Sequence, residues 1–329
     1  MDTILVTGGA GFIGANLVAA LLAAGGRRIA VCDRLDHPAK PGNIDRAPLA
    51  ALFPPEDLPN FMAQEGGRLA AVCHLGAISS TTEQSWERLQ RDNVDATLRL
   101  WRWCAQANVP LLYASSAATY GDGSAGFDDD FTAEGLARLK PLNLYGRSKH
   151  ETDREIRRLL DAGEKAPPQW AGLKFFNVYG PHETHKGDMR SIVCKLHEQI
   201  RDTGVARLFR STHPDFGDGG QLRDFIWVGD CVDFMLWLLA NPKTSGLFNV
   251  GTGAPRSFLD AAKATFAAMG REPRIEFIDM PLSLRGKYQY YTRAETARLR
   301  GAGYRKPFTG LEEGVRRYVQ EFLERQDRT

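Results

Sequence analysis

The amino-acid sequence predicts an α/β protein, built on a doubly wound parallel sheet and completed by a smaller C-terminal α/β domain. Two observations lead to this prediction. In the first half of the 329-residue chain, short β-branched and apolar runs alternate with stretches of helical pattern, an alternation typical of parallel βαβ units. After residue 177 the alternation stops, and long polar stretches separate the remaining apolar segments.

Short apolar runs in the first half are interpreted as strands, at residues 3–7, 28–32, 70–75, 110–114 and 171–176. Helical patterns lie between them, at residues 12–24, at 88–106 and over a segment that includes 145–160. Because parallel strands need long crossover connections, this order predicts one parallel sheet covered by helices.

The predicted domain boundaries follow from where this alternation ends. The first domain comprises residues 1–176 and a return segment at about 222–250, which contains a further strand at 247–250. The smaller domain comprises residues 177–221 and 251–329. Its polar stretches are 181–188 and 213–221, of which the second is expected to be a loop, and its tail at 294–326 is expected to be mostly helical.

The composition excludes several classes of protein. The formal net charge is +2, and basic residues are scattered among nearly as many acidic ones, so nucleic-acid binding is not expected. No apolar run approaches the ~18 residues of a membrane-spanning helix, and no signal-peptide pattern is present. Five dispersed cysteines without a CxxC pair indicate reduced thiols, and no metal-ligand spacing occurs. We expect a cytoplasmic protein without a metal site.

A glycine-rich turn follows the first predicted strand. Gly8, Gly11 and Gly14 lie in the stretch GGAGFIG, which leads into the helix at residues 12–24. Glycines allow a tight turn and let a pyrophosphate approach the main chain, while the helix N-terminus offers free N–H groups to the phosphates. Asp33 ends the second predicted strand 19 residues after Gly14, where an acidic side chain can hold the adenosine ribose. This combination predicts a Rossmann-type dinucleotide site.

The residues around Asp33 leave the choice between NAD and NADP open. Asp33 favours NAD because its carboxylate can accept hydrogen bonds from the ribose hydroxyls. Arg34 and Lys40 follow closely in the sequence and could bind the 2′-phosphate of NADP. Arg34 could equally be a solvent-exposed charge at the end of a strand.

A second local pattern predicts acid/base chemistry. Tyr145 and Lys149 are four residues apart at the start of a predicted helix, so they lie on one face, one turn apart. A nearby ammonium lowers the pKa of a phenol, which lets a tyrosine exchange a proton with an alcohol during hydride transfer. Ser116 follows a predicted strand 29 residues before Tyr145. Its hydroxyl can hydrogen-bond the same oxygen, although a serine at that place can also cap a helix.

Three further stretches are SSTTE at residues 79–83, HKG at 185–187 and GKYQ at 286–289. Together with the GxxGxxG spacing of the glycine turn and the YxxxK pair, they resemble the ADP-L-glycero-D-manno-heptose 6-epimerases, a branch of the extended short-chain dehydrogenases/reductases. The glycine spacing and the YxxxK pair are shared by the wider family, whereas the three stretches are more specific. The resemblance runs nearly from end to end.

The resemblance implies a reaction and a pair of catalytic roles. Enzymes of that family oxidise C6 of the heptose in ADP-D-glycero-D-manno-heptose with tightly held NADP, and return the hydride to the other face, in lipopolysaccharide core heptose synthesis. Each face needs its own acid/base, and the resemblance assigns Tyr145 to one face and Lys186 to the other. From its polar, glycine-flanked context alone, Lys186 could equally bind a phosphate or be an ordinary surface lysine. A homo-oligomer is also expected.

The resemblance further places residues around the two ligands. The cofactor-binding set, which includes the glycine turn and the Tyr–Lys pair, is Gly8, Gly11, Phe12, Ile13, Gly14, Asp33, Arg34, Lys40, Leu75, Gly76, Ala77, Ile78, Ser79, Asn93, Tyr145, Lys149, Val178 and Lys186. The set around the nucleotide-sugar, ADP-heptose, is Ser79, Ser80, Ser116, Asn177, Asp188, Lys195, Phe209, Arg223 and Tyr288. Arg223 suits a diphosphate because a guanidinium pairs well with it, but it could instead form an ion pair with Asp224 inside the domain.

The chain departs from the family pattern near the expected sugar pocket. Asp188 stands where the family has serine, Lys195 where it has histidine, and the loop before Arg223 is longer. Residues 41–61 contain no obvious equivalent of the family's second cofactor lysine. Alternative functions are another nucleotide-sugar epimerase, a 4,6-dehydratase, or a non-catalytic NADP(H)-binding sensor. A dehydratase needs an Asp-Glu pair where this chain has Ala-Ala-Thr at 117–119, and a sensor commonly lacks the tyrosine or the lysine.

Overall fold

The computed structural model describes residues 2–45, 47–281 and 289–326. Its centre is a seven-stranded sheet in the order β11-β6-β5-β4-β1-β2-β3, and every neighbouring pair is parallel. The strands are β1 (Thr3–Thr7), β2 (Arg28–Cys32), β3 (Ala51–Phe53), β4 (Leu69–His74), β5 (Leu111–Ser116), β6 (Trp170–Phe175) and β11 (Gly246–Val250). The predicted doubly wound parallel sheet is confirmed.

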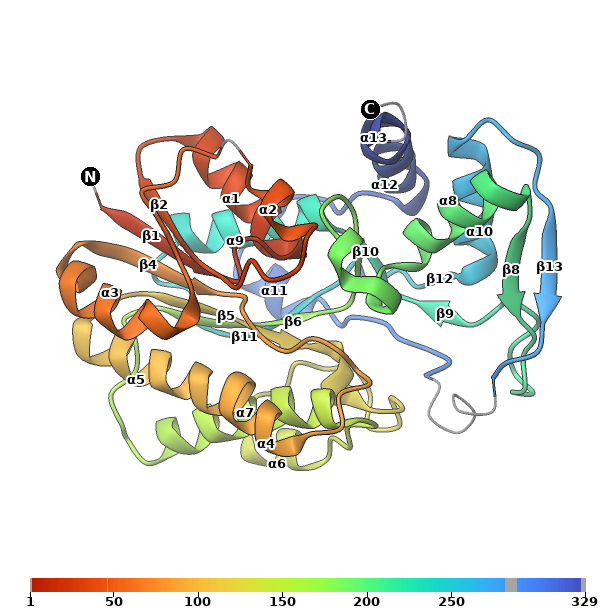
Figure 1. Cartoon of the computed structure of the whole chain (residues 1–329). Coiled ribbons are helices and arrows are strands. Elements are labelled where there is room, and N and C mark those ends of the chain that lie inside the picture. The colour runs from red at the N-terminus through yellow and green to blue at the C-terminus, as the bar shows by residue number, and fades with distance from the viewer. Residues whose placement is uncertain (1, 46, 282–288, 327–329) are drawn as a thin grey trace.

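Helices cover both faces of this sheet (Figure 1). One face carries α1 (Phe12–Ala24) and α9 (Val228–Ala240), and the other carries α5 (Ala96–Ala107) and α7 (Leu144–Asp161). Ile4 and Val6 of β1 pack in the core under α1 and α9, whereas Leu5 packs in the core under α5 and α7. Successive strand side chains point to opposite faces, so a sheet covered on both sides is apolar at nearly every position.

Two segments beside the sheet differ from the prediction. The edge strand β3 was not expected, because its three partly exposed residues are too few to show a periodicity. The helix predicted at residues 88–106 is divided into α4 (Trp86–Leu89), a π-helical turn (Gln90–Asp95) and α5. Turns of this kind often occur at functional sites.

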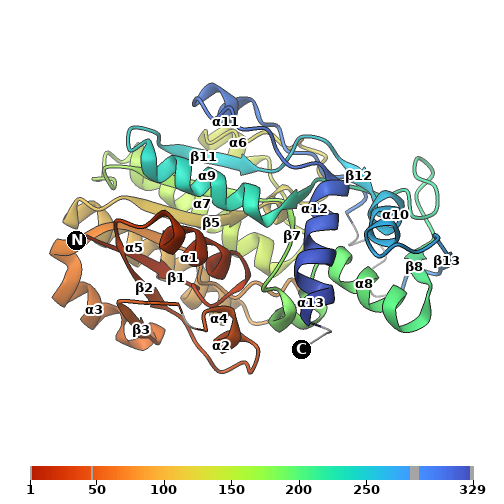
Figure 2. The same cartoon turned by 90° about the horizontal axis from the view of Figure 1, so that it is seen from above.

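A smaller unit lies beyond the carboxyl ends of the sheet strands (Figures 1 and 2). Its helices α8 (Ile192–Thr203), α10 (Phe258–Ala268) and α12 (Leu311–Tyr318) share one apolar core. Its strand pairs are β8 (Ala206–Phe209) with β13 (Ile275–Ile278), β7 (Asn177–Tyr179) with β10 (Phe225–Trp227), and β9 (Leu222–Arg223) with β12 (Arg256–Ser257). The stretch 213–221 is a loop, as predicted.

The C-terminal tail is mostly helical, as predicted, and is divided into several elements. It forms α11 (Ala297–Gly301), a non-helical connection and α12, followed by a π-helical turn (Val319–Leu323) and α13 (Glu324–Gln326). Leu299 and Tyr304 pack in the core under α9, so the chain returns to the large sheet before it ends in the smaller unit.

Within the described ranges, no helix combines the length and apolar character needed to cross a bilayer. The same residues contain no group of three or more His, Cys, Asp or Glu side chains that could hold a metal ion. All five cysteines are free and buried.

Candidate active site

The glycine turn brings the first helix close against the sheet. Gly8 has a φ of +68°, in the left-handed region, and a Cβ there would lie 2.6 Å from the backbone nitrogen of Gly76. A Cβ on Gly14 would lie 2.0 Å from the carbonyl oxygen of Gly8. Only glycine fits these two positions, and Gly11 forms the N-cap of α1. The main chain and the helix N-terminus are therefore accessible to phosphates, as a dinucleotide requires.

A cavity of about 630 Å³ opens beside this turn. It lies at the carboxyl ends of β1, β2 and β4, where the strand order reverses between β1 and β4. Dinucleotides bind at such switch points of open parallel sheets. Residues of the predicted cofactor set that line the cavity are Gly8, Asp33, Arg34, Lys40, Gly76, Ala77 and Ile78. The residues present therefore fit a nicotinamide dinucleotide.

Two helices complete the cavity with residues that the sequence analysis missed. Leu58 and Met62 come from α3 (Leu58–Glu65), and Arg99 and Trp103 come from α5. Each pair is separated by four residues, so each pair faces the cavity from a single helical face. This spacing is visible in the sequence, but nothing local indicates that these faces meet the glycine turn.

Asp33 is held firmly at the end of β2. Its carboxylate accepts a hydrogen bond from the backbone nitrogen of Ala10 at 2.8 Å and is paired with the ammonium of Lys40, also at 2.8 Å. Lys40 donates a second hydrogen bond to the carbonyl oxygen of Arg34 at 3.1 Å. The exposed guanidinium of Arg34 is paired with Glu56. The two predicted phosphate-binding cations are thus next to Asp33, and each has an acidic partner.

The loop after β4 is anchored by Asn93 from the π-helical turn. The fully buried amide of Asn93 accepts a hydrogen bond from the Ile78 nitrogen at 2.8 Å and donates to the Ile78 carbonyl at 3.0 Å. It also donates to the Ser148 hydroxyl of α7 at 2.9 Å. Asn93 therefore connects the loop after β4 to α7, the helix that carries Tyr145.

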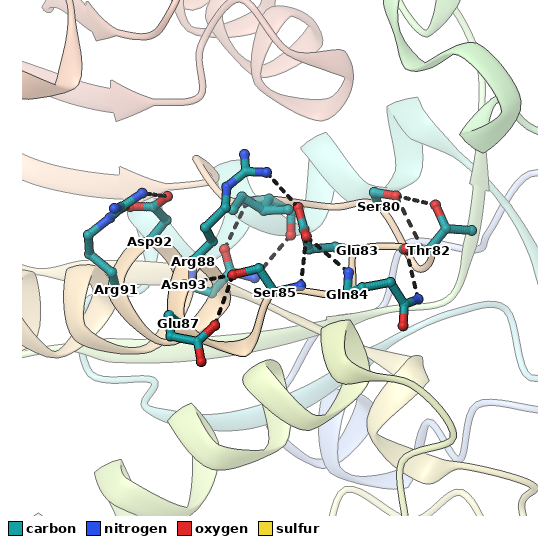
Figure 3. Close-up of polar contacts among 11 residues, drawn as sticks. Ser80, Thr82, Glu83, Gln84, Ser85, Glu87, Arg88, Arg91, Asp92 and Asn93 are labelled. Atoms are coloured by element: carbon teal, nitrogen blue, oxygen red, sulfur yellow. Dashed lines mark hydrogen bonds and ion pairs between the residues drawn. The ribbon is translucent and has the colours of Figure 1, made fainter.

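The SSTTE stretch forms a polar network beside this loop (Figure 3). The Glu83 carboxylate accepts hydrogen bonds from the backbone nitrogens of Gln84 and Ser85 and from the guanidinium of Arg88. The hydroxyls of Ser80 and Thr82 are 2.8 Å apart. Glu83 thus shapes the stretch, and Ser79 is left exposed at its start.

The Tyr145 centre is assembled where α7 approaches the end of β5. Asn143 caps α7 by accepting a hydrogen bond from the Gly146 nitrogen at 2.7 Å. A Cβ on Gly146 would lie 2.6 Å from the Ala118 carbonyl oxygen, so this glycine permits the close approach. Burial raises the pKa of the Tyr145 phenol, and a hydrogen bond with Ser116 opposes that rise. The structure thus brings Tyr145 and Ser116 together.

Lys149 lies one turn further along α7 and is almost completely buried. Its ammonium donates a hydrogen bond to the Ala114 carbonyl oxygen at 2.9 Å. Burial lowers the pKa of Lys149 to about 8, while Asp153 acts in the opposite direction. The ammonium form of Lys149 therefore predominates at neutral pH.

Lys186 lies in a 3₁₀-helical segment (Thr184–Met189) rather than in a fully irregular stretch. Its ammonium is 5.3 Å from the centre of the Phe12 ring, at the first residue of α1. Burial lowers the pKa of Lys186, and Glu183 opposes this shift. The lysine is half-buried against the cofactor helix, which does not fit an ordinary surface lysine.

Individual side chains hold the loop that carries Lys186. Glu183 is buried and accepts hydrogen bonds from the nitrogen and hydroxyl of Ser191. Asn43 donates to the carbonyl oxygens of Ala10, at 2.9 Å, and His182, at 3.3 Å. The loop is therefore attached both to α8 and to the glycine turn.

The residues expected around the substrate are more dispersed. Arg223 is buried, with its guanidinium 5.5 Å from the Phe258 ring centre. Asn177 accepts a hydrogen bond from Thr292 at 3.3 Å. Phe209 ends β8. Tyr288 lies outside the described residues.

Comparison with known proteins identifies the family of the chain. Residues 4–251 match the NAD dependent epimerase/dehydratase family. The chain belongs to this family. It is 48% identical to the ADP-L-glycero-D-manno-heptose-6-epimerase of Nitratidesulfovibrio vulgaris over 97% of each chain.

Two solved structures extend the comparison. The ADP-L-glycero-D-manno-heptose-6-epimerase of Helicobacter pylori is 25% identical, with a TM-score of 0.79 over 97% of this chain and 96% of that one. The UDP-glucose 4-epimerase of Thermus thermophilus, in complex with NAD, is 26% identical, with a TM-score of 0.75 over 98% of this chain and 99% of that one. The chain is thus an enzyme of this epimerase family that uses a nicotinamide cofactor.

Two departures of this epimerase-family chain from the expected pattern are neighbours in space. The ammonium of Lys195, on α8, donates a hydrogen bond to the backbone carbonyl of Asp188 at 2.7 Å. Asp188 itself is exposed at the end of the segment that carries Lys186. The two changes therefore form one local unit.

Proposed function

We propose that this protein inverts C6 of ADP-D-glycero-D-manno-heptose, giving the L-glycero epimer, with a nicotinamide cofactor that is not consumed. The observation that carries the proposal is the placement of two lysines. Lys149 is buried one turn beyond Tyr145 on α7, and the Lys186 ammonium lies against the Phe12 ring in the first turn of α1. Similarity to relatives whose names state this activity supports the choice of substrate.

The residues divide the proton chemistry between the two faces of C6. Tyr145 takes the proton of the C6 hydroxyl on one face, assisted by the Lys149 ammonium and the Ser116 hydroxyl. The bound nicotinamide supplies the hydride acceptor and, in the return step, the hydride donor. Lys186 gives a proton to the C6 oxygen on the other face. A lysine can serve in this way when burial lowers its pKa toward the working pH, which is the direction found here.

The proposal is tested directly by the stereochemistry at C6. Incubation of the purified holoenzyme with ADP-D-glycero-D-manno-heptose should produce a mixture of the two C6 epimers, resolved by NMR of the heptose. Cofactor absorbance should show no net change, because the hydride is returned. Absence of inversion, or equally fast turnover of UDP-glucose, would contradict the proposed substrate.

NADP is proposed as the preferred cofactor. The carboxylate of Asp33 would repel a 2′-phosphate, and its pairing with Lys40 offsets that charge. Arg34 lines the same cavity and adds a second cation. Lys40 and Arg34 together favour a phosphate at this end of the cavity.

Two further parts of the proposal concern the setting of the enzyme. A cytoplasmic location is proposed from the dispersed cysteines and the absence of a signal-peptide pattern, and a homo-oligomeric assembly is proposed as well. Light scattering of the holoenzyme in solution measures the assembly, and a monomer would contradict that part.

A further inference from the structure

A fully buried ion pair lies behind the proposed reaction centre. The ammonium of Lys174, on β6, is 3.0 Å from the carboxylate of Asp153, on α7. The side chains are 1% and 0% exposed. Removing two opposite charges from water is costly, and good geometry with further hydrogen bonds is needed to offset that cost.

The other partners of this pair come from the end of β5 and the turn after it. Asp153 accepts hydrogen bonds from the hydroxyls of Ser115, at 2.7 Å, and Tyr113, at 3.2 Å. Lys174 donates to the Thr119 hydroxyl at 2.7 Å, and its ammonium lies 4.8 Å from the centre of the Tyr120 ring. The ion pair thus joins α7, β5 and β6.

The same contacts lead directly to the residues assigned to catalysis. Ser115 precedes Ser116, and the Thr119 hydroxyl donates back to the Ser116 carbonyl oxygen at 2.8 Å. Asp153 is one helical turn beyond Lys149, whose ammonium is bound to the carbonyl oxygen of Ala114. Ser116 and Lys149 are therefore both tied to the buried pair.

We propose that Asp153 and Lys174 are positioning residues, which lock the end of β5 against α7 so that Ser116 and Lys149 meet Tyr145. Neither side chain reaches solvent, so both act through these three residues rather than on a ligand. This inference rests on the proposed function, because it takes the Tyr145 centre as the site of proton exchange.

Charge adds a second consequence of the same geometry. Tyr145 and Asp153 lie one turn before and one turn after Lys149 on α7, and His74 on β4 also interacts with its charge. Asp153 in turn interacts with Lys174 on β6 and His150 on α7. Burial lowers the pKa of His74 to about 3 and that of His150 to about 4, so both are neutral near pH 7. Asp153 raises the pKa of Lys149. Loss of that carboxylate lowers the pKa of Lys149, so its ammonium is lost at a lower pH.

The test compares three variants with a matched control. Lys174→Met removes the partner of Asp153, Lys174→Arg keeps a cation, and Asp153→Asn keeps the shape without the charge. The control, Arg158→Met, breaks an exposed ion pair with Glu155 on the same helix. Epimerisation kcat and KM are measured across pH for each protein, together with thermal melting.

The expected pattern separates positioning from general stability. Lys174→Met should lower kcat by about 10²-fold with little change in KM, because small misplacements of catalytic groups are expensive. Lys174→Arg should recover most of this loss, and Asp153→Asn should move the alkaline decline of kcat to lower pH. Folded Lys174→Met or Asp153→Asn protein with wild-type kcat and pH profile would overturn the inference. If Lys174→Met does not fold, Asp153→Asn and Lys174→Arg carry the test.

A spectroscopic measurement makes the result independent of the substrate. The pKa of Tyr145 is read as the difference in phenolate absorbance between each protein and its Tyr145→Phe counterpart. Lys174→Met should raise the pKa of Tyr145, because misplacement of Ser116 weakens the hydrogen bond that lowers it. Arg158→Met should leave that pKa in place; an unchanged pKa in Lys174→Met contradicts the inference. Absence of C6 inversion by the wild-type enzyme contradicts only the proposed function.

Discussion

The two amines of the candidate site are held in different ways. Lys149 is on the 18-residue helix α7, almost fully buried, with its ammonium bound to a carbonyl oxygen of β5. Lys186 is half-buried in a six-residue 3₁₀ segment, beside Gly187 with a φ of +52°. Burial lowers the pKa of both. The comparison teaches that burial can lower the pKa of a lysine either on a regular helix or in a loop held by single side chains.

The helix that carries Lys149 and the loop that carries Lys186 should respond differently to substitutions. On the α7 side, Asn143, Gly146 and the Asp153–Lys174 pair all position one rigid helix. On the loop side, individual side-chain contacts hold the chain, such as those of Glu183 and Asn43 with neighbouring segments. Changes on the α7 side should therefore affect chemistry, whereas changes on the loop side should affect chemistry and the placement of the loop together.

The largest expected effect is that of Tyr145→Phe. Removing the phenolic oxygen should lower kcat by about 10²–10⁴-fold, the usual contribution of a general acid/base, with cofactor binding nearly unchanged. Epimerisation kinetics measure kcat, and cofactor titration measures cofactor affinity. Tyr304→Phe is the matched control, because the Tyr304 hydroxyl is buried away from the site without a hydrogen-bond partner in the described structure. Turnover close to wild type in Tyr145→Phe would remove this residue from the mechanism.

The second prediction tests the loop side of the comparison. Lys186→Met should lower the rate of net inversion at C6 by about 10²-fold or more, while the cofactor and the nucleotide-sugar still bind. An aldehyde analogue that is oxidised at one end and reduced at the other separates the half-reactions, since each half should depend on a different base. The matched control is Lys263→Met, on the exposed face of α10.

A rival role for Lys186 makes a different kinetic prediction. If Lys186 anchors a phosphate, its loss should raise KM with little change in kcat. That result would leave the Tyr145 side intact and end the two-base assignment.

The parts of the molecule that could be predicted from sequence are those in which the signal is local. The glycine turn, the acid at the end of β2 and the Tyr145–Lys149 spacing each lie within one or two elements, and the fold class follows from the order of such elements. The helices α8 and α10 were missed, although Ser191 and Ser257 cap their first turns. Ser257 even forms a capping box with Asp260, a pattern visible in the sequence.

Other features could not be predicted because they depend on distant segments meeting. Arg99 and Trp103 of α5 line the same cavity as Thr7 and Gly8 at the end of β1, and only the folded chain brings these segments together. Asp153 and Lys174 look like ordinary charged residues, and their burial follows from the pairing of β5 with β6. No spacing in the sequence relates these positions to one another.

The third prediction concerns acid stability on the α7 side. His74 is buried between the hydroxyls of Thr7 and Thr97, and burial lowers its pKa to about 3. A depressed pKa means that stability is fully present above the unfolded value near 6.5 and is lost as pH falls toward the folded value. His74 alone should contribute about 1.4 kcal/mol per pH unit in that window. Chemical denaturation of wild type and His74→Gln between pH 6.5 and 4.5 measures the slope; equal slopes would contradict the prediction.

The smallest expected effect lies at the adenosine end of the cavity, away from both amines. The melting temperature should rise more with NADP than with NAD at equal concentration, because ligand stabilisation follows affinity and a tenfold difference in Kd is worth about 1.4 kcal/mol.

Lys40→Met should reduce that preference for NADP, since it removes a cation and leaves the Asp33 carboxylate to repel the 2′-phosphate. A hydrogen bond to a charged group is worth about 1.5–3 kcal/mol, so the loss should be about ten- to a hundredfold for NADP and smaller for NAD. Arg34→Met should have a weaker effect because that guanidinium is exposed and already paired with Glu56. Neither substitution should change the pH dependence of kcat at saturating cofactor. Among the described residues, no hydrogen bond or ion pair joins Tyr145, Lys149 or Lys186 to Asp33 or Lys40. A larger stabilisation by NAD would reverse the cofactor assignment while leaving the contrast between the two amines untouched.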